Sequence, residues 1–561
     1  MKGMPNTGLT NKILNGRWSF AIITILFLIA TFWANNDVLF VDIMESRNII
    51  TAREMVYDGN WVMTTMNGEP RLEKPPLPTW IAAVSEMTSP GDIALQRAWA
   101  GVAAMLLVVF FHKLGKVLFG DRRVAVVASL VLCTSYSVVL MGRTASWDIW
   151  CHCFMLGAIW QMVVALRDTN TTRWGSWIMA GVLTGLSVMS KGPVSLFALF
   201  LPFLIAYGIF GREKRGKLKS RSIVAPAVVM TIIALAVGGW WYLYVYLENA
   251  TQTAAVVAKE SGSWVNRNVR PWYYYSTFFA ETGVWALMTL TALLVPVWSR
   301  RMAKPRPYLF CLAWMIAIVV ILSLMPEKKN RYLLPMLIPA AYTVGAVLWQ
   351  MYVSLNTQAW GEKDKLVGRL FNVNAWLLLL VIAAAPIVCA VMFVAKGKVS
   401  VLMGVMMAVC FWTAAALVWS AIRKRNPMFL LGGVTTLFVS VEILFFPLLG
   451  SLFKNPDYHS ISEIRDKAEL RNVPFYSLRS DSLRIEIVYE AGRKIRPIEE
   501  KELLGKVPCV LVTLKSVDEA LPESVRKKVK CKEVGAFDSN RQPKSDRHYQ
   551  DGLLYRATMI E

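Results

Sequence analysis

The chain has 561 residues, of which 55% are hydrophobic and 18% charged, and its mean hydropathy is +0.43. A water-soluble core could not bury this much apolar surface, so lipid is expected to be part of the protein's solvent. A net charge of +23 could indicate nucleic-acid binding. Most basic residues, however, lie in short loops between apolar runs, where they orient a membrane protein in the bilayer.

Apolar runs near the spanning threshold of roughly 18 residues recur to about residue 450. The first begins at Trp18 and lacks a small-residue cleavage signature, which is typical of an uncleaved signal anchor. The pattern predicts an all-α polytopic membrane domain over residues 1–454, with about thirteen transmembrane helices. The later runs lie near residues 98–118, 123–141, 146–166, 174–190, 193–210, 223–246, 277–298, 307–324, 332–354, 374–395, 399–421 and 428–450.

Lysine and arginine collect in alternate loops, and such loops face the cytoplasm. The basic N-terminus carries Lys2, Lys12 and Arg17, and further basic clusters follow near residues 113–123, 167–173, 212–221, 300–306 and 423–425. The alternation predicts a cytoplasmic N-terminus. With an odd number of spans, it also predicts a periplasmic C-terminal domain.

Two polar stretches are expected outside the membrane. Residues 35–97 form a long first loop with a helical patch at Glu45–Tyr57, and residues 455–561 turn polar. In the tail, short β-rich runs at 475–478 and 507–514 alternate with helical runs at 483–491 and 499–504, which predicts a small α/β domain. Cys509 and Cys531 lie in this tail and could pair if it is periplasmic.

Charged residues on the outer side break the orientation rule and are therefore the candidates for function. Lys and Arg gathered at one membrane face indicate an anionic ligand, for which phosphate is the usual choice, and acids among them supply a general base. The candidates are Asp42, Glu45, Arg47, Arg71, Glu73, Lys74, Arg143, Asp148, Lys191, Arg270, Lys328, Arg331 and Tyr332.

Structural explanations exist for several of these residues. Asp42 and Glu45 fit a helix capping box, and the lysines at 74, 191 and 328 could extend their ammonium groups to the interface. Arg143 and Asp148 could form an ion pair. The aromatic run after Pro271 suits either an interfacial belt or a sugar-stacking platform.

In their order along the chain, these motifs resemble the GT-C glycosyltransferases that use polyprenyl-phosphate sugars, in particular the lipid A aminoarabinose transferase group related to protein O-mannosyltransferases. The similarity rests on an acidic first loop ending in Glu-Lys-Pro, Arg and Asp at the fourth span, Lys-Gly-Pro after the fifth, Pro-Trp-Tyr-Tyr before the eighth, and Lys…Arg-Tyr-x-Leu-Pro at the tenth. About thirteen spans with a small outer C-terminal domain are also similar to that group.

The resemblance implies roles for individual residues. A first-loop acid, Asp42 or Glu45, would act at the reaction centre with Asp148 as a supporting acid, while Arg47, Lys74 and Lys191 would bind the donor phosphate. Met44 stands where the family has an aspartate, so the choice between the two acids stays open. The remaining candidates are expected to line the substrate cavity: Arg71, Glu73, Arg143, Arg270, Lys328, Arg331 and Tyr332.

The function expected from this resemblance is a hexosyl or pentosyl transfer in the bacterial inner membrane, from a polyprenyl-phosphate sugar to lipid A, another glycolipid, a glycan or a protein. The sequence contains no Gly-rich nucleotide loop, and Asn266–Val269 lacks the family's extracytoplasmic histidine, so no cofactor is predicted, and a divalent metal stays open as an alternative. The alternatives are a transporter or flippase of a lipid-linked sugar, which predicts polar residues near mid-bilayer, and a non-catalytic scaffold.

Overall fold

The computed structural model describes residues 17–168, 171–211, 221–356, 364–452, 455, 457–541, 549–550 and 552–561. Contacts divide the chain into two compact units. Unit 1 comprises Met1–Asn36, Glu73–Leu77 and Arg97–Phe446, and unit 2 comprises Asp37–Leu72, Pro78–Gln96 and Pro447–Glu561. Most of the first loop thus groups with the tail, and the division at residue 454 stays a prediction. The N-terminal lysines and the basic loop 212–220 lie outside the described residues.

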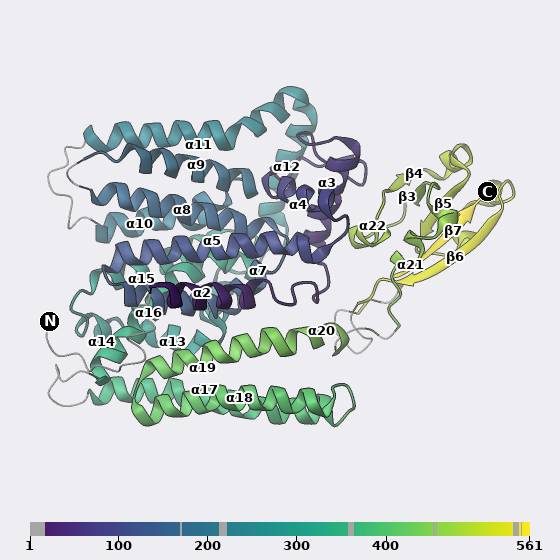
Figure 1. Cartoon of the computed structure of the whole chain (residues 1–561). Coiled ribbons are helices and arrows are strands. Elements are labelled where there is room, and N and C mark those ends of the chain that lie inside the picture. Colours follow the sequence, from purple (N-terminus) through teal and green to yellow (C-terminus); the bar gives the residue numbers. More distant parts are fainter. Residues whose placement is uncertain are drawn as a thin grey trace. The chain divides into compact units, whose positions relative to one another are not determined.

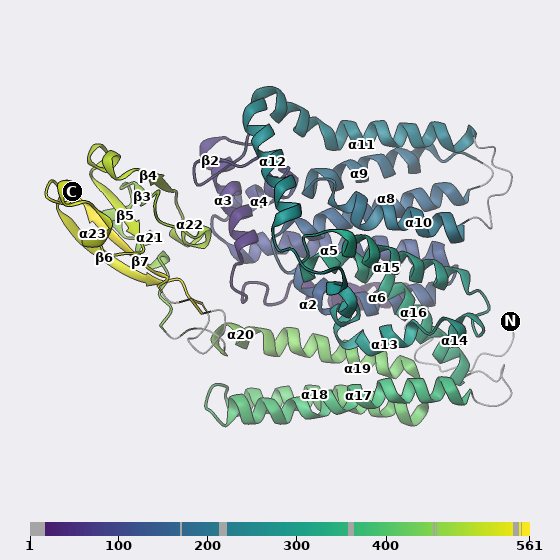
Figure 2. The ribbon, with the colours of Figure 1, turned by 180° about the vertical axis from the view of Figure 1, so that it is seen from behind.

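Unit 1 is a bundle of long helices, in which α8 packs against α9, α9 against α11, and α17 and α19 against α18 (Figures 1 and 2). The most apolar stretch of the α16 span is 89% buried, whereas that of the α17 span is 11% buried, so α16 forms the centre and α17 the periphery. The helices are α2 (Arg17–Phe32), α5 (Ile93–Phe119), α6 (Arg122–Cys133), α7 (Tyr136–Gly142), α8 (Trp147–Arg167), α9 (Trp174–Lys191), η1 (Leu196–Phe200), α10 (Leu201–Phe210), α11 (Arg221–Glu248), α12 (Ala250–Asn266), η3 (Trp272–Trp285), α13 (Ala286–Ala292), α14 (Val295–Ser299), α15 (Arg306–Leu324), η4 (Asn330–Leu333), α16 (Leu334–Asn356), α17 (Lys365–Cys389), η5 (Ala390–Val394), α18 (Val401–Lys424), α19 (Pro427–Ser440) and η6 (Val441–Phe445). The next helix, α20 (Phe446–Leu452), belongs to unit 2 from Pro447 on.

The helical character predicted from the apolar runs is confirmed, with local differences. Within the described residues, eight helices are long and apolar enough to span a membrane, or up to nine if a bent pair counts as one span. That pair is α6 and α7, which replace the single helix expected over 123–141 and meet at an angle of 71°. The helix expected over 277–298 is divided among η3, α13 and α14, where Gly283 takes a φ of 64°. The count of thirteen stays a prediction.

Unit 2 combines first-loop helices with the tail sheet. The first loop contributes α3 (Ile43–Asp58), the hairpin β1 (Thr65–Met66) and β2 (Glu69–Pro70), and α4 (Leu77–Thr88). Ile50 of α3 is 2% exposed and belongs to the hydrophobic core of the tail domain. The tail contributes α21 (Ser462–Arg465), η7 (Ala468–Leu470), β3 (Phe475–Leu478), α22 (Ile485–Ala491), β4 (Ile495–Ile498), η8 (Glu500–Lys506), β5 (Cys509–Thr513), α23 (Val517–Ala520), α24 (Glu523–Arg526), β6 (Cys531–Asp538) and β7 (Leu554–Ile560).

The tail sheet has the strand order β4-β3-β5-β7-β6, with β3 parallel to β4 and β5, and β7 antiparallel to β5 and β6. The predicted α/β domain is therefore confirmed, and β3 has the predicted bounds. Cys509 and Cys531 both align with Ile560, from opposite sides of β7. Two strand spacings of about 4.8 Å each separate the cysteines, too far for the disulfide that the sequence left open.

Candidate functional site

In unit 1, three cationic side chains surround the ring of Tyr332. The Lys329 Nζ, the Lys191 Nζ and the Arg331 Cζ lie 5.4, 5.8 and 5.8 Å from the ring centroid. Each distance is within the range of about 6 Å over which an aromatic face attracts a cation. The cations come from two distant parts of the chain, the C-terminal end of α9 and the loop that leads through η4 into α16.

Helix ends account for the positions of the nearest ion pair. Lys191 is the last residue of α9, where the helix dipole favours a cation, and Gly192 ends the helix with a φ of 75°. Asp148 lies in the first turn of α8, where the dipole favours an acid. The Lys191 ammonium donates to the Asp148 carboxylate, and the two side chains are 10% and 7% exposed.

The loop before η4 adds more positive than negative charge. The Lys329 ammonium donates to the Glu327 carboxylate at 2.5 Å. The Lys328 ammonium donates to the carbonyl of Arg270 at 3.1 Å and to that of Met325, and burial lowers the pKa of Lys328. The Arg331 Nε is buried and lacks a hydrogen-bond partner within the described residues. Three bases (Lys191, Lys329 and Arg331) therefore gather at Tyr332 with two acids (Asp148 and Glu327), and we call these residues the Tyr332 cluster.

Two tyrosines of the aromatic run position this loop. The Tyr275 hydroxyl donates to the carbonyl of Lys329 and accepts from its N–H, each at 3.0 Å. The Tyr274 hydroxyl donates to the Asn330 Oδ1 at 2.8 Å. Trp272, by contrast, is 75% exposed. The run after Pro271 thus divides into exposed aromatics and tyrosines that hold the cationic loop in place.

Reciprocal ion pairs tie the Glu-Lys-Pro motif to α12. The Lys74 ammonium lies 3.1 Å from the Glu260 carboxylate, and the Lys259 ammonium lies 3.4 Å from that of Glu73. The far end of α12 reaches the Tyr332 cluster, because the carbonyl of Trp264 accepts from the Glu327 N–H at 3.2 Å. Lys74 is therefore occupied by a carboxylate in this structure.

In unit 2, the first-loop acids form the capping box that the sequence suggested. The Asp42 carboxylate accepts from the N–H groups of Met44 and Glu45 at 2.6 and 2.8 Å, and Glu45 accepts from the Asp42 N–H at 3.2 Å. Arg71 donates to the Arg47 carbonyl at 2.9 Å and so stabilises the same helix. The Arg47 Nε is buried without a hydrogen-bond partner within the described residues.

Arg143 lies in a separate buried cluster of unit 1. Its guanidinium donates to the carbonyls of Thr31 and Ala34 at the end of α2 and lies 4.6 Å from the ring of Phe446. Glu442 is 1% exposed, and neither of its carboxylate oxygens has a hydrogen-bond partner within the described residues. The Arg143–Asp148 ion pair considered from the sequence is replaced by these contacts, since Asp148 pairs with Lys191.

Sequence reasoning did not single out Glu260 and Glu442. Glu442 had a signal, because it lies within the apolar span at 427–449, where an acid is costly. Glu260 had none, since its partner lies 186 residues away in the chain. Among the described residues, no group of three or more His, Cys, Asp or Glu is placed to hold a metal ion.

Comparisons with known proteins bear on this arrangement. Residues 73–241 match the dolichyl-phosphate-mannose-protein mannosyltransferase family. The solved structure of ArnT from Cupriavidus metallidurans bound to undecaprenyl phosphate matches 97% of this chain and 98% of that chain, with a TM-score of 0.67 at 16% identity. The chain has the ArnT fold. The expected resemblance to GT-C glycosyltransferases of the ArnT type is therefore confirmed.

Curated relatives extend the comparison with ArnT. The undecaprenyl phosphate-alpha-4-amino-4-deoxy-L-arabinose arabinosyl transferase 2 of Proteus mirabilis (strain HI4320) is 26% identical over 59% of this chain and 60% of that protein. The corresponding transferase of Serratia proteamaculans (strain 568) is 23% identical over 74% of this chain and 73% of that protein. The match thus spans about 60% of the length of the first of these relatives. Together with the apolar helices, the ArnT-type fold makes this chain a multi-pass inner-membrane protein.

Proposed function

We propose that the chain transfers a sugar from a polyprenyl-phosphate carrier to an extracytoplasmic acceptor, such as lipid A, another glycolipid, a glycan or a protein. The observation that carries the proposal is the excess of cations in the Tyr332 cluster, where three bases face two acids. The names of the relatives, which are undecaprenyl-phosphate aminoarabinose transferases, support a lipid-phosphate donor.

In the proposed mechanism, an acceptor hydroxyl displaces polyprenyl phosphate at the anomeric carbon in one step. Negative charge grows on the departing phosphate, and fixed cations in a site of low dielectric constant stabilise it. Arg331 offers a fork of N–H donors that suits phosphate oxygens. Lys191 adds a second charge, which Asp148 holds in place. Lys74 joins the phosphate-binding group when the donor replaces Glu260 as its partner.

The first-loop candidates complete the proposal. A carboxylate, Asp42 or Glu45, would deprotonate or orient the acceptor, and Arg47 would contribute to phosphate binding. Both acids cap α3 through bonds from backbone N–H groups, and Glu45 is fully buried whereas Asp42 is exposed. Asp42→Ala and Glu45→Ala, compared with Asp42→Asn and Glu45→Gln, separate the loss of the helix cap from the loss of a base.

The proposed orientation places the N-terminus in the cytoplasm and the C-terminal domain in the periplasm. Basic residues in alternate loops support it, among them the pairs at 122–123 and 300–301. Reporter fusions at the C-terminus test this orientation. A periplasmic phosphatase reporter should be active there, and a reporter that fluoresces only in the cytoplasm should be silent.

Lys74→Ala tests the proposed function in cells. Lipidomics of a deletion strain should show the loss of one glycosylated product, and wild-type protein should restore it. Lys74→Ala should fail to restore the product while reaching wild-type levels in the membrane, and Lys74→Arg, which keeps the charge, should restore part of it. Full restoration by Lys74→Ala would refute the assignment.

A further inference from the structure

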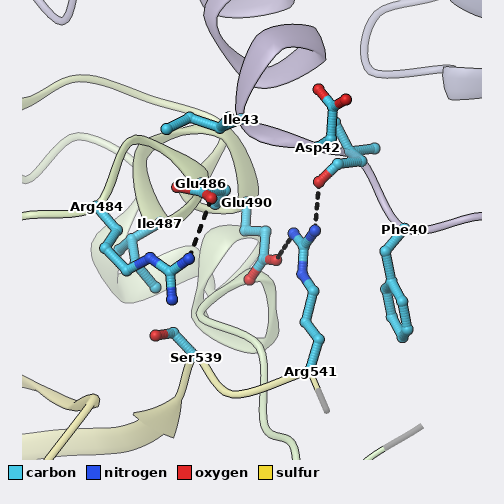
Figure 3. Close-up of a pocket in the computed structure, with 10 residues that line it drawn as sticks. Phe40, Asp42, Ile43, Arg484, Glu486, Ile487, Glu490, Ser539 and Arg541 are labelled. Carbon is cyan, nitrogen blue, oxygen red and sulfur yellow. Dashed lines mark hydrogen bonds and ion pairs between the residues drawn. The ribbon is translucent and has the colours of Figure 1, made fainter. Parts of the chain in front are cut away.

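A pocket of about 260 Å³ with several charged lining residues lies in unit 2, between the start of α3 and the tail domain (Figure 3). This volume is just below the range of roughly 300–1,000 Å³ that is usual for ligand pockets, so it suits a single small ring and not a lipid chain. The lining residues that matter for its chemistry are Phe40, Asp42, Arg484, Glu486, Ser539 and Arg541.

One wall of the pocket is fixed by a saturated ion pair. The Glu490 carboxylate accepts from Arg541 at 2.6 Å, from the Tyr458 hydroxyl at 2.6 Å and from the Ser460 hydroxyl at 2.8 Å. Burial, together with the neighbouring Glu490, raises the pKa of Tyr458 to about 12, so this phenol stays a hydrogen-bond donor at neutral pH. Arg541 also donates to the Val41 carbonyl. These groups shape the pocket but have little capacity left for a ligand.

Two other lining groups are unsatisfied. The Glu486 Oε2 and the Ser539 Oγ are buried without a hydrogen-bond partner within the described residues. The other oxygen of Glu486 accepts from Arg484 at 3.4 Å, which is long for a hydrogen bond between charged groups. Figure 3 shows Arg484, Glu486 and Ser539 along the same side of the pocket. Buried polar atoms are almost always hydrogen-bonded, so the Glu486 carboxylate and the Ser539 hydroxyl are the lining groups with capacity for a hydrogen bond from a ligand.

The charge of the lining decides which class of partner fits. Two acids (Glu486 and Glu490) and two bases (Arg484 and Arg541) of the lining are paired with one another, so the pocket offers no excess positive charge for a phosphate. A carboxylate oxygen and a hydroxyl accept hydrogen bonds from hydroxyl or ammonium groups, and the Arg484 guanidinium donates to ring or hydroxyl oxygens. Phe40 is 40% exposed, and its ring lies 5.3 Å from the Arg541 guanidinium, so it adds apolar surface at the edge of the pocket beyond Arg541.

We propose that this pocket binds a saccharide ring carrying hydroxyl or amino groups, held by Glu486, Ser539 and Arg484. Asp42 lines this pocket and is also a candidate base of the proposed transfer, but Glu486, Ser539 and Arg484 have no role in that reaction, and the binding test needs neither a donor nor turnover. The two failures are therefore distinguishable: absence of transfer would not refute saccharide binding, and absence of saccharide binding would not refute transfer.

Saccharide binding to the full chain in lipid nanodiscs tests the site. The probes are methyl β-D-glucosaminide, methyl β-D-glucoside and glucose 1-phosphate, followed by saturation-transfer NMR and by calorimetry. The first two should bind and compete with each other, whereas the sugar phosphate should not. The proposal would be overturned if neither of the two phosphate-free probes bound, or if glucose 1-phosphate competed equally well.

Variants place the binding in this pocket. Glu486→Gln and Ser539→Ala should each weaken glucosaminide binding about tenfold, the effect expected for the loss of one hydrogen bond to a polar or charged group. Glu533→Gln is the matched control, because Glu533 is also paired with an arginine of the tail, at 3.3 Å from Arg556, but lies outside the pocket. Ser539→Ala removes only one oxygen and keeps the test valid if Glu486→Gln unfolds the tail. Unchanged affinity in Ser539→Ala would contradict the proposed site.

Discussion

Arg143 and Arg331 both lie in the helical unit, and their surroundings differ in a way that separates structure from function. Arg143 is fully buried, and its guanidinium donates to two backbone carbonyls at the end of α2. The Arg331 Nε has no hydrogen-bond partner within the described residues, and the guanidinium lies beside Tyr332 with two lysines. The comparison teaches that an arginine near an apolar span is a ligand-binding candidate only when its N–H groups are not already used by the fold.

Removing Arg143 should have the largest effect, on stability. Arg143→Met deletes two hydrogen bonds to carbonyls and leaves the buried Glu442 without its nearby cation, so unit 1 should lose on the order of 3–5 kcal/mol. Thermal unfolding in detergent measures the loss. The double variant Arg143→Met with Glu442→Leu should recover much of it, because no buried charge then remains unpaired. An unfolding temperature equal to that of wild type in Arg143→Met would contradict the structural role.

Removing Arg331 should affect the ligand instead. Arg331→Gln should weaken the binding of polyprenyl phosphate about tenfold, since one charge-assisted contact is lost, while the free energy of unfolding changes by less than about 0.5 kcal/mol. Native mass spectrometry with increasing lipid measures the affinity. The distinction between the two arginines fails if Arg331→Gln destabilises the bundle and leaves lipid binding unchanged.

A smaller effect is expected at the ion pair between Lys74 and Glu260. Glu260→Gln removes the carboxylate that occupies Lys74, so polyprenyl phosphate should bind about threefold more tightly, in keeping with the small free energy of a partly exposed ion pair. Glu248→Gln is the control, because Glu248 is an exposed acid near the start of α12 with no ion pair among the described residues. Equal affinities in both variants would show that Glu260 does not compete for Lys74.

The smallest effect is expected at the cysteines of the tail. Because β7 separates Cys509 from Cys531, a reducing agent should change neither the mass nor the unfolding temperature of the protein. A maleimide reagent should label exposed Cys531 and spare buried Cys509 in the folded chain. A mass lower by two hydrogens under non-reducing conditions, with both thiols unreactive, would contradict the strand order.

Local signals predicted much of the fold. The capping box at Asp42 and Glu45 predicted the start of α3, because both partners lie within one helical turn. The strand β3 matched the short β-rich run at 475–478, which is also a local signal. The bend between α6 and α7 was not predicted because the run over 123–141 contains no proline, although Thr134, Ser135 and Ser137 interrupt its apolar residues at the bend.

Parts of the site depend on contacts between distant segments, which sequence spacing does not encode. The candidates Lys191, Arg331 and Tyr332 were named from their charges and motifs, but the gathering of the two cations at the Tyr332 ring is a tertiary property. The same holds for the pairing of Lys74 with Glu260. Glu442, by contrast, could have been found, because a single acid in an apolar span is a local signal.

Sugar transfer from the lipid-phosphate donor is tested most directly in proteoliposomes that contain a polyprenyl-phosphate sugar and a lipid A acceptor. Mass spectrometry should detect the glycosylated acceptor and free polyprenyl phosphate in equal amounts with the wild-type chain, and neither with Lys74→Ala. Movement of the donor across the bilayer without a new glycosidic bond would contradict the account and favour a flippase.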